Sequence, residues 1–164
     1  NVRVHPVALS ATAGIGTLHV PRGSATSPSA SLRASSDDGA ALDVPLAPLD
    51  AFEFADLMFV KIDVEGAELD VLRGATETLE RCRPLLFVEI EQRHHREPIA
   101  AVFDEIARLG YDGAFLDGAG RLRPLSSFDV ERCQLEAAVH PDRTRPYINN
   151  FFFSPSGGNR RWPM

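Results

Sequence analysis

Carboxylate side chains stand at the ends of two apolar segments of this sequence. Asp63 and Glu65 directly follow the first segment, and Glu89 and Glu91 lie at the end of the second. Residues two apart in a strand share a face, so the side chains of Lys61 and Asp63 lie on the same face, and so do those of Glu89 and Glu91. In open parallel sheets, ligands bind beyond the carboxyl ends of the strands. The four acids therefore predict an acidic pocket wall at one edge of such a sheet.

Lys61 is a charged residue inside an otherwise apolar segment. An unpaired buried charge costs several kcal/mol or more, so Lys61 must have an acidic partner. We expect that partner to be Glu89 on the neighbouring strand. The pair has two interpretations that the sequence does not separate, a purely structural ion pair or part of a functional site.

The stretch Asp63-Val64-Glu65-Gly66-Ala67-Glu68 combines a strand end, a glycine and a helix start. Gly66 allows the sharp backbone turn that this change of direction needs. Acids in a first helical turn also complement the helix dipole, and this is the interpretation that we favour for Glu68. For Asp63, the position at the carboxyl end of a strand favours a functional role.

His94 and His95 directly follow the second apolar segment. Imidazoles at this edge of a sheet suit metal binding or general-base catalysis, although a polar, solvent-facing loop is the more common explanation of such a run. Glycine-rich phosphate-binding and nucleophile-elbow motifs are absent from the sequence.

The elements that must position these side chains form an α/β pattern. Residues 57–62 and 84–91 are nearly continuous apolar runs, which is typical of parallel strands buried on both faces and covered by helices. Between them, residues 67–82 have helical spacing interrupted by Gly74, which predicts two short helices. A further helix is predicted over 99–109. A hairpin over 113–123 and a closing strand at 150–153 follow.

The N-terminal part is less regular. Strands are predicted over 2–9, 17–20 and 43–47, separated by a Ser-, Ala- and Gly-rich flexible loop at 22–41. The order of all these elements is that of the second half of an open α/β sheet.

Bulk properties narrow the class of protein. A chain of 164 residues fits one domain, and its net charge of −6 argues against a nucleic-acid or anionic-membrane binder. No apolar run approaches the ~20 residues of a membrane span. The two cysteines, Cys82 and Cys133, fit no metal-ligand spacing and are expected as free thiols in the cytoplasm.

The stretch FVKIDVEGAELDVLRGA at residues 59–75 strongly resembles the signature of the FkbM family of methyltransferases. Three further segments match at the intervals expected for that family: NVRVHPVALS at 1–10, PLLFVEIE at 84–91 and YINNFFF at 147–153. The resemblance therefore covers nearly the whole chain.

The resemblance implies a class I methyltransferase (Rossmann-like) fold, a mostly parallel sheet with helices on both faces and the strand order 3-2-1-4-5-7-6. Residues 2–9 would be strand 3, 57–63 strand 4 and 84–91 strand 5, with the hairpin and 151–153 as strands 6 and 7. It also implies S-adenosylmethionine (SAM) as cofactor and methyl transfer to a hydroxyl of a small natural product or sugar.

The family carries a glycine-rich loop and a ribose-binding acid before strand 3, and neither is found in these residues. We therefore expect residues 1–155 to form a partial FkbM-type domain without the N-terminal strands, followed by a tail at 156–164. The exposed strand edge would then be covered by a second copy or a partner. The chain alone is expected neither to bind SAM nor to turn over, which calorimetry would test.

The site residues implied by the resemblance fall into three groups. Asp63 is the first choice of catalytic base, or a ligand to a divalent cation that orients the hydroxyl, with Glu65 and His94 as further catalytic candidates. The cofactor is expected to contact Ala8, Ser10 and Asp63. The substrate is expected to contact Glu89, Glu91 and His95.

Two other classes of function stay open. One is a non-catalytic binding or assembly module that keeps the sheet without the cofactor loop. A glycine-rich strand–loop–helix encoded upstream would decide against it. The other is a metal-dependent hydrolase using Asp63, Glu89, His94 and His95, which have suitable ligand types but no familiar spacing.

Overall fold

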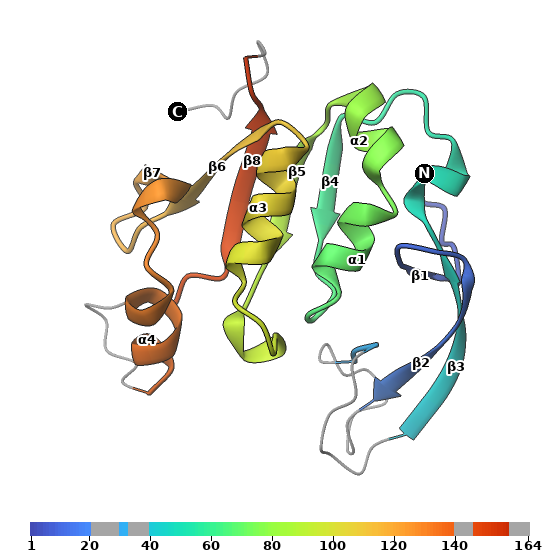
Figure 1. The fold of residues 1–164 in the computed structure, drawn as a ribbon, viewed down its shortest axis with the longest axis horizontal. Helices are drawn as coiled ribbons and strands as arrows, with labels where there is room; N and C mark the ends of the chain where they lie inside the picture. The colour runs from blue at the N-terminus through green and yellow to red at the C-terminus, as the bar shows by residue number, and fades with distance from the viewer. Residues whose placement is uncertain (21–29, 33–39, 140–145, 158–164) are drawn as a thin grey trace.

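The structure, a computed structural model, describes residues 1–20, 30–32, 40–139 and 146–157. It contains a three-stranded sheet of order β1-β3-β2 and a five-stranded sheet of order β4-β5-β8-β6-β7 (Figure 1). The strands are β1 (Ala8–Leu9), β2 (Gly14–Val20), β3 (Ala40–Ala47), β4 (Phe59–Ile62), β5 (Leu85–Glu89), β6 (Tyr111–Leu116), β7 (Leu122–Pro124) and β8 (Asn150–Pro155). The α-helices are α1 (Glu68–Arg73), α2 (Thr76–Cys82), α3 (Ala100–Arg108) and α4 (Glu136–Val139). None of the helices in these ranges has the length and apolar character that a membrane span requires.

The five-stranded sheet has mixed strand directions. β4 and β5 pair in parallel, whereas β8 runs antiparallel to both of its neighbours, β5 and β6. β7 is antiparallel to β6 as the second arm of a hairpin. The expectation of a mostly parallel sheet is therefore wrong, because the last strand inserts between β5 and β6 against their direction. The order β4-β5-β8-β6 is nevertheless the one expected for strands 4-5-7-6.

The helices α1, α2 and α3 lie on one face of this sheet (Figure 1). Beneath them, the inward side chains of the sheet are fully buried, for example Leu86, Val88 and Phe151 at 0% exposure. The alternate side chains point to the opposite face, where Phe59 is 50% exposed and the rings of Phe87 and Phe152 pack 5.0 Å apart. Within the described residues, the expectation of helices on both faces is thus wrong, and the apolar runs alternate between a buried and a half-exposed face.

The locally encoded elements agree with the sequence. Residues 67–82 form the two short helices α1 and α2, α3 follows with a strongly amphipathic stripe, and β6 and β7 form the expected hairpin. The closing strand is β8. The helical segment that begins with a π-helix at Glu131–Leu135 and continues as α4 was not expected.

The N-terminal prediction of a strand over 2–9 is largely wrong. Only Ala8–Leu9 are in strand conformation, and this short β1 pairs in parallel with β3, outside the five-stranded sheet. β2 and β3 form a longer antiparallel pair that includes the strands expected at 17–20 and 43–47. The loop expected at 22–41 lies outside the described residues except for 30–32 and for 40–41, where β3 has already begun.

Two contacts fix the N-terminal part against the α1–α2 corner. A Cβ atom added to Gly74 would lie 2.1 Å from the carbonyl oxygen of Ser10, so only glycine lets the backbone after β1 approach this closely. The Asp50 carboxylate accepts hydrogen bonds from the backbone N–H groups of Glu77 and Thr78, at 3.1 and 2.8 Å. Asp50 thereby supplies the N-terminal cap that α2 lacks within its own segment.

Candidate functional site

The turn after β4 carries the first group of acids in a constrained backbone. Glu65 has a positive φ of 49° and Gly66 follows with a φ of 96°. A non-glycine residue in the left-handed region is strained and persists only where its surroundings hold it. The Ser31 hydroxyl donates to the Glu65 carbonyl oxygen at 2.8 Å, and Glu68 Oε1 accepts from the Gly66 N–H at 2.9 Å. These bonds hold the turn that directs the Glu65 side chain.

Asp63 lies at the tip of β4 as expected, but its ion pair differs from the prediction. Lys61 Nζ contacts Asp63 Oδ2 at 2.6 Å, and the described residues contain no ion pair between Lys61 and Glu89. The predicted Lys61–Glu89 pair is therefore wrong, because a same-face partner two residues along the strand is within easier reach. The Asp63 side chain is 39% exposed, and no hydrogen bond within the described chain occupies its Oδ1 atom.

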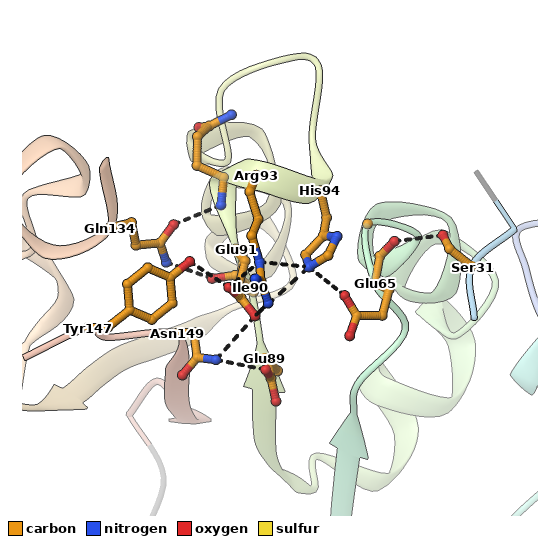
Figure 2. A network of polar contacts seen from close by, with 12 residues as sticks. Ser31, Glu65, Glu89, Ile90, Glu91, Arg93, His94, Gln134, Tyr147 and Asn149 are labelled. Atoms are coloured by element: carbon orange, nitrogen blue, oxygen red, sulfur yellow. Dashed lines mark hydrogen bonds and ion pairs between the residues drawn. The ribbon is translucent and has the colours of Figure 1, made fainter. Parts of the chain in front are cut away.

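Glu91 is the most deeply buried acid of the cluster, with 3% of its side chain exposed. Arg93 Nε lies 2.8 Å from its Oε2 atom, and the Tyr147 hydroxyl donates to the same oxygen at 2.5 Å. Asn149 Nδ2 lies 3.3 Å from Oε1 (Figure 2). Burial alone would raise the pKa of Glu91, but these donors outweigh burial and lower it below its ordinary value. Glu91 is thus a charged anchor for the side chains around it.

Glu89 lies beside Glu91, but its pKa is shifted in the opposite direction. Its Oε1 accepts a single hydrogen bond from Asn149 Nδ2 at 2.7 Å. Burial raises the pKa of Glu89 to about 7, and the neighbouring carboxylates Asp63 and Glu91 add to the shift. A carboxyl group in this position gains or loses its proton near neutral pH, which is the behaviour expected of an acid–base group.

His94 joins the two strand ends. Its Nε2 atom lies 2.5 Å from Glu65 Oε2, and Arg93 Nε approaches the same nitrogen at 3.1 Å (Figure 2). One ring nitrogen cannot both donate to a carboxylate and accept from a guanidinium, so only one of these two contacts can be a hydrogen bond at a time. Burial raises the pKa of Glu65, against the opposing effect of His94. The two side chains therefore form a close carboxylate–imidazole contact between the two strand ends.

His95 points elsewhere and is buried with Glu68. Its Nε2 atom lies 2.8 Å from Glu68 Oε2, and the two side chains are only 8% and 2% exposed. Glu68 thus does more than complement the start of α1, because it also contacts this histidine. His94 and His95 diverge toward different acids. Among the residues that the structure describes, no group of three or more His, Cys, Asp or Glu side chains is arranged to hold a metal ion.

Three residues of the site were not found from the sequence. Tyr147 and Asn149 contact Glu91 and Glu89 from the segment that leads into β8. Gln134 is 2% exposed and binds three backbone groups around the end of β5: it accepts from Gln92 N at 2.7 Å and donates to the oxygens of Ile90 and Ile148, each at 2.8 Å. Each of the three residues lies at least 42 positions along the sequence from its partner at the end of β5. No local sequence pattern therefore marks them.

The expected cofactor contacts at Ala8 and Ser10 lie across a cavity from β4. Ala8 pairs with β3, and Ser10 N donates to the Ala47 oxygen at 3.1 Å. Leu9, which lies between them, lines an apolar cavity of about 260 Å³. The side chains of β4 and Val64 form another part of the wall of this cavity. Ile62 and Val64 form the part of its wall nearest to the acidic cluster. The cavity and the cluster therefore adjoin at the tip of β4.

The arrangement defines a class of protein: an α/β domain with carboxyl and imidazole side chains at the carboxyl ends of adjacent parallel strands, where such folds bind small ligands. Residues 5–112 match the family described as the methyltransferase FkbM domain, and the chain belongs to this family. Gln134, Tyr147 and Asn149 lie beyond the matched residues. No match was found among curated proteins or among solved structures.

Cys82 and Cys133 are free thiols.

Proposed function

We propose that this protein transfers the methyl group of SAM to a hydroxyl of a small natural product or sugar. Membership of the FkbM methyltransferase family supports methyl transfer. A hydroxyl must lose its proton as it attacks, so an oxygen acceptor requires a nearby base. The observation that carries the proposal is the gathering of Asp63, Glu65, Glu89 and His94 at the tips of β4 and β5, with one carboxyl group whose pKa lies at about 7.

The residues around the β4 tip suit parts of the cofactor. Leu9, Ile62 and Val64 offer an apolar surface of the kind on which an adenine ring packs. The carboxylates of Asp63 and Glu65 offer negative charge for the cationic end of the molecule. SAM, when bound, supplies an electrophilic methyl group on a sulfonium. The chain's own contribution is then to align the acceptor hydroxyl with that methyl group and to exclude water.

Asp63 is the proposed base. Lys61 holds Asp63 Oδ2 at 2.6 Å and thereby orients the carboxylate, which leaves Oδ1 directed away from this ion pair to receive a proton. The Glu65–His94 pair is the second candidate, since a carboxylate and an imidazole lie 2.5 Å apart between the two strand ends. Glu91 positions both Arg93 and Tyr147 and is not assigned a proton-transfer role. A divalent cation on Asp63 is an alternative way to orient the hydroxyl.

The test uses the full-length gene product with methyl-labelled SAM and a panel of hydroxylated natural products and sugars. Asp63→Asn keeps the size of the side chain but removes the base, so turnover should fall at least about a hundredfold, the lower range for general-base catalysis. The matched control is Asp56→Asn, an exposed aspartate before β4. Near-normal transfer by Asp63→Asn, with unchanged thermal stability, would remove Asp63 from the mechanism.

The same panel separates the proposal from its rival. If no acceptor is methylated and no SAM binding is measured for the full-length gene product, the FkbM-type domain is a non-catalytic binding or assembly module. Methylation of a nitrogen or carbon acceptor in place of oxygen would keep the family's chemistry and refute the hydroxyl assignment.

A further inference from the structure

A second cavity lies beside the acidic cluster and differs from it in charge. It has a volume of about 560 Å³, within the range of small-molecule sites, and is framed by the β6–β7 hairpin, the segment before α4 and the residues 146–148. Arg121, Arg123 and Arg132 line it together with Asp117 and Asp129. In a protein with a net charge of −6, three guanidinium groups around one hollow form a local positive site.

Among the described residues, two of these arginines have no acidic partner. Arg121 Nε contacts Asp117 Oδ2 at 2.9 Å, so their charges compensate each other. Asp129 is engaged with the backbone, since its Oδ1 accepts from the Arg132 N–H at 3.1 Å. No carboxylate in the described part of the chain lies within ion-pair distance of the guanidinium of Arg123 or Arg132. Both residues are exposed, and both line the cavity.

The cavity opens at the same edge of the sheet as the acidic cluster. β6 is separated from β5 by one strand, β8, that is antiparallel to both, so β6 runs in the direction of β5. Asp117 follows β6 directly and therefore stands at the carboxyl edge, as Glu89 does on β5. Residues 146–149 form a shared wall: Ile148 lines the cavity, whereas Tyr147 and Asn149 contact the acids.

We propose that this cavity binds the carboxylate of the acceptor, so that the substrate is a hydroxylated carboxylic acid such as an acidic sugar. This substrate class rests on the proposed function, but the binding site does not. Arginine pairs with carboxylates through two parallel hydrogen bonds. Among the described residues that line the cavity, the three arginines exceed the two aspartates by one positive charge, which matches a single carboxylate. A doubly charged phosphate would meet the same two aspartates at greater electrostatic cost.

The experiment is calorimetric titration of the purified chain with D-glucuronate, glucose and inorganic phosphate, without any methyl donor. Glucuronate should bind and glucose should not. Arg123→Gln and Arg132→Gln should each weaken glucuronate binding about tenfold, the loss expected for a charge-assisted hydrogen bond. Arg73→Gln is the matched control, because Arg73 is an exposed arginine on α1 outside the cavity. Thermal melting of each variant checks the fold.

Several outcomes would overturn the site: no glucuronate binding, tighter binding of phosphate than of glucuronate, or an equal loss in Arg73→Gln. The two proposals fail separately. Glucuronate binding that depends on Arg123 and Arg132, without methyl transfer to any acidic sugar, keeps the site and refutes the function assigned to it. Transfer to neutral acceptors together with an absence of glucuronate binding keeps the function and refutes the site.

Discussion

Replacing Gln134 with leucine tests whether one buried amide organises the site. The side chains are similar in size, but leucine offers neither the acceptor for Gln92 N nor the donors for the carbonyls of Ile90 and Ile148. Each buried backbone group left without a partner costs about 1–3 kcal/mol. Three such groups predict a loss of at least about 3 kcal/mol in the free energy of unfolding, a large part of the roughly 5–15 kcal/mol typical of a domain.

The assay is urea unfolding followed by circular dichroism and evaluated by linear extrapolation. Leu135→Gln, at the neighbouring position where the side chain is 41% exposed, is the control and should change stability by less than about 0.5 kcal/mol. Gln134→Glu keeps an acceptor for Gln92 N but places an oxygen against two carbonyl oxygens, so it should be destabilising as well. A loss below about 1 kcal/mol in Gln134→Leu would refute the reasoning, because the three backbone groups would then have other partners.

Three further changes follow from contacts in the fold. Gly74→Ala should cost about 1–3 kcal/mol in urea unfolding because its Cβ would meet the Ser10 carbonyl at 2.1 Å; unchanged stability would mean that the backbone after β1 moves freely. Asp50→Ala should lower stability by about 1–2 kcal/mol through loss of the α2 cap, whereas Asp56→Ala should not. The pKa of Glu89 is raised from its ordinary value of 4.5 to about 7 in the folded state, so wild-type stability should fall as pH rises between these values. Glu89→Gln should remove that part of the slope, and identical pH profiles would contradict it.

The elements that the sequence predicted well are those with a strong local signal. Such signals are the apolar runs at β4 and β5, the interrupted helical spacing around Gly74 and the apolar stripe of α3. In each of them, the spacing of apolar residues over a short segment is enough to indicate a strand or a helix. The turn at Glu65 and Gly66 also follows from residue types, because a glycine after an acid marks the change from strand to helix. These parts placed Asp63, Glu65, Glu89 and Glu91 at one edge of the sheet.

The failed predictions depend on contacts that no local pattern encodes. Lys61 had two acids within reach, and only the geometry of the strand end decides between Asp63 and Glu89. A continuous apolar run does not tell whether its second face is covered, so the half-exposure of Phe87 went unpredicted. The short helical segment containing Gln134 has polar and apolar residues without a clear stripe. Tyr147 was recognised only as part of a matching segment, and its contact with Glu91 spans 56 residues.

The wall formed by residues 146–149 has a consequence for how this domain tolerates change. Tyr147 contacts Glu91, whereas the next residue, Ile148, lines the cavity with the arginines, so two successive side chains serve different sites. Inserting or deleting one residue within these four would reverse which side chains meet the acids and which meet the arginines. Sequence length is therefore restricted here even though the backbone is irregular, and a ligand that displaces Ile148 must also shift the hydroxyl that Tyr147 presents to Glu91.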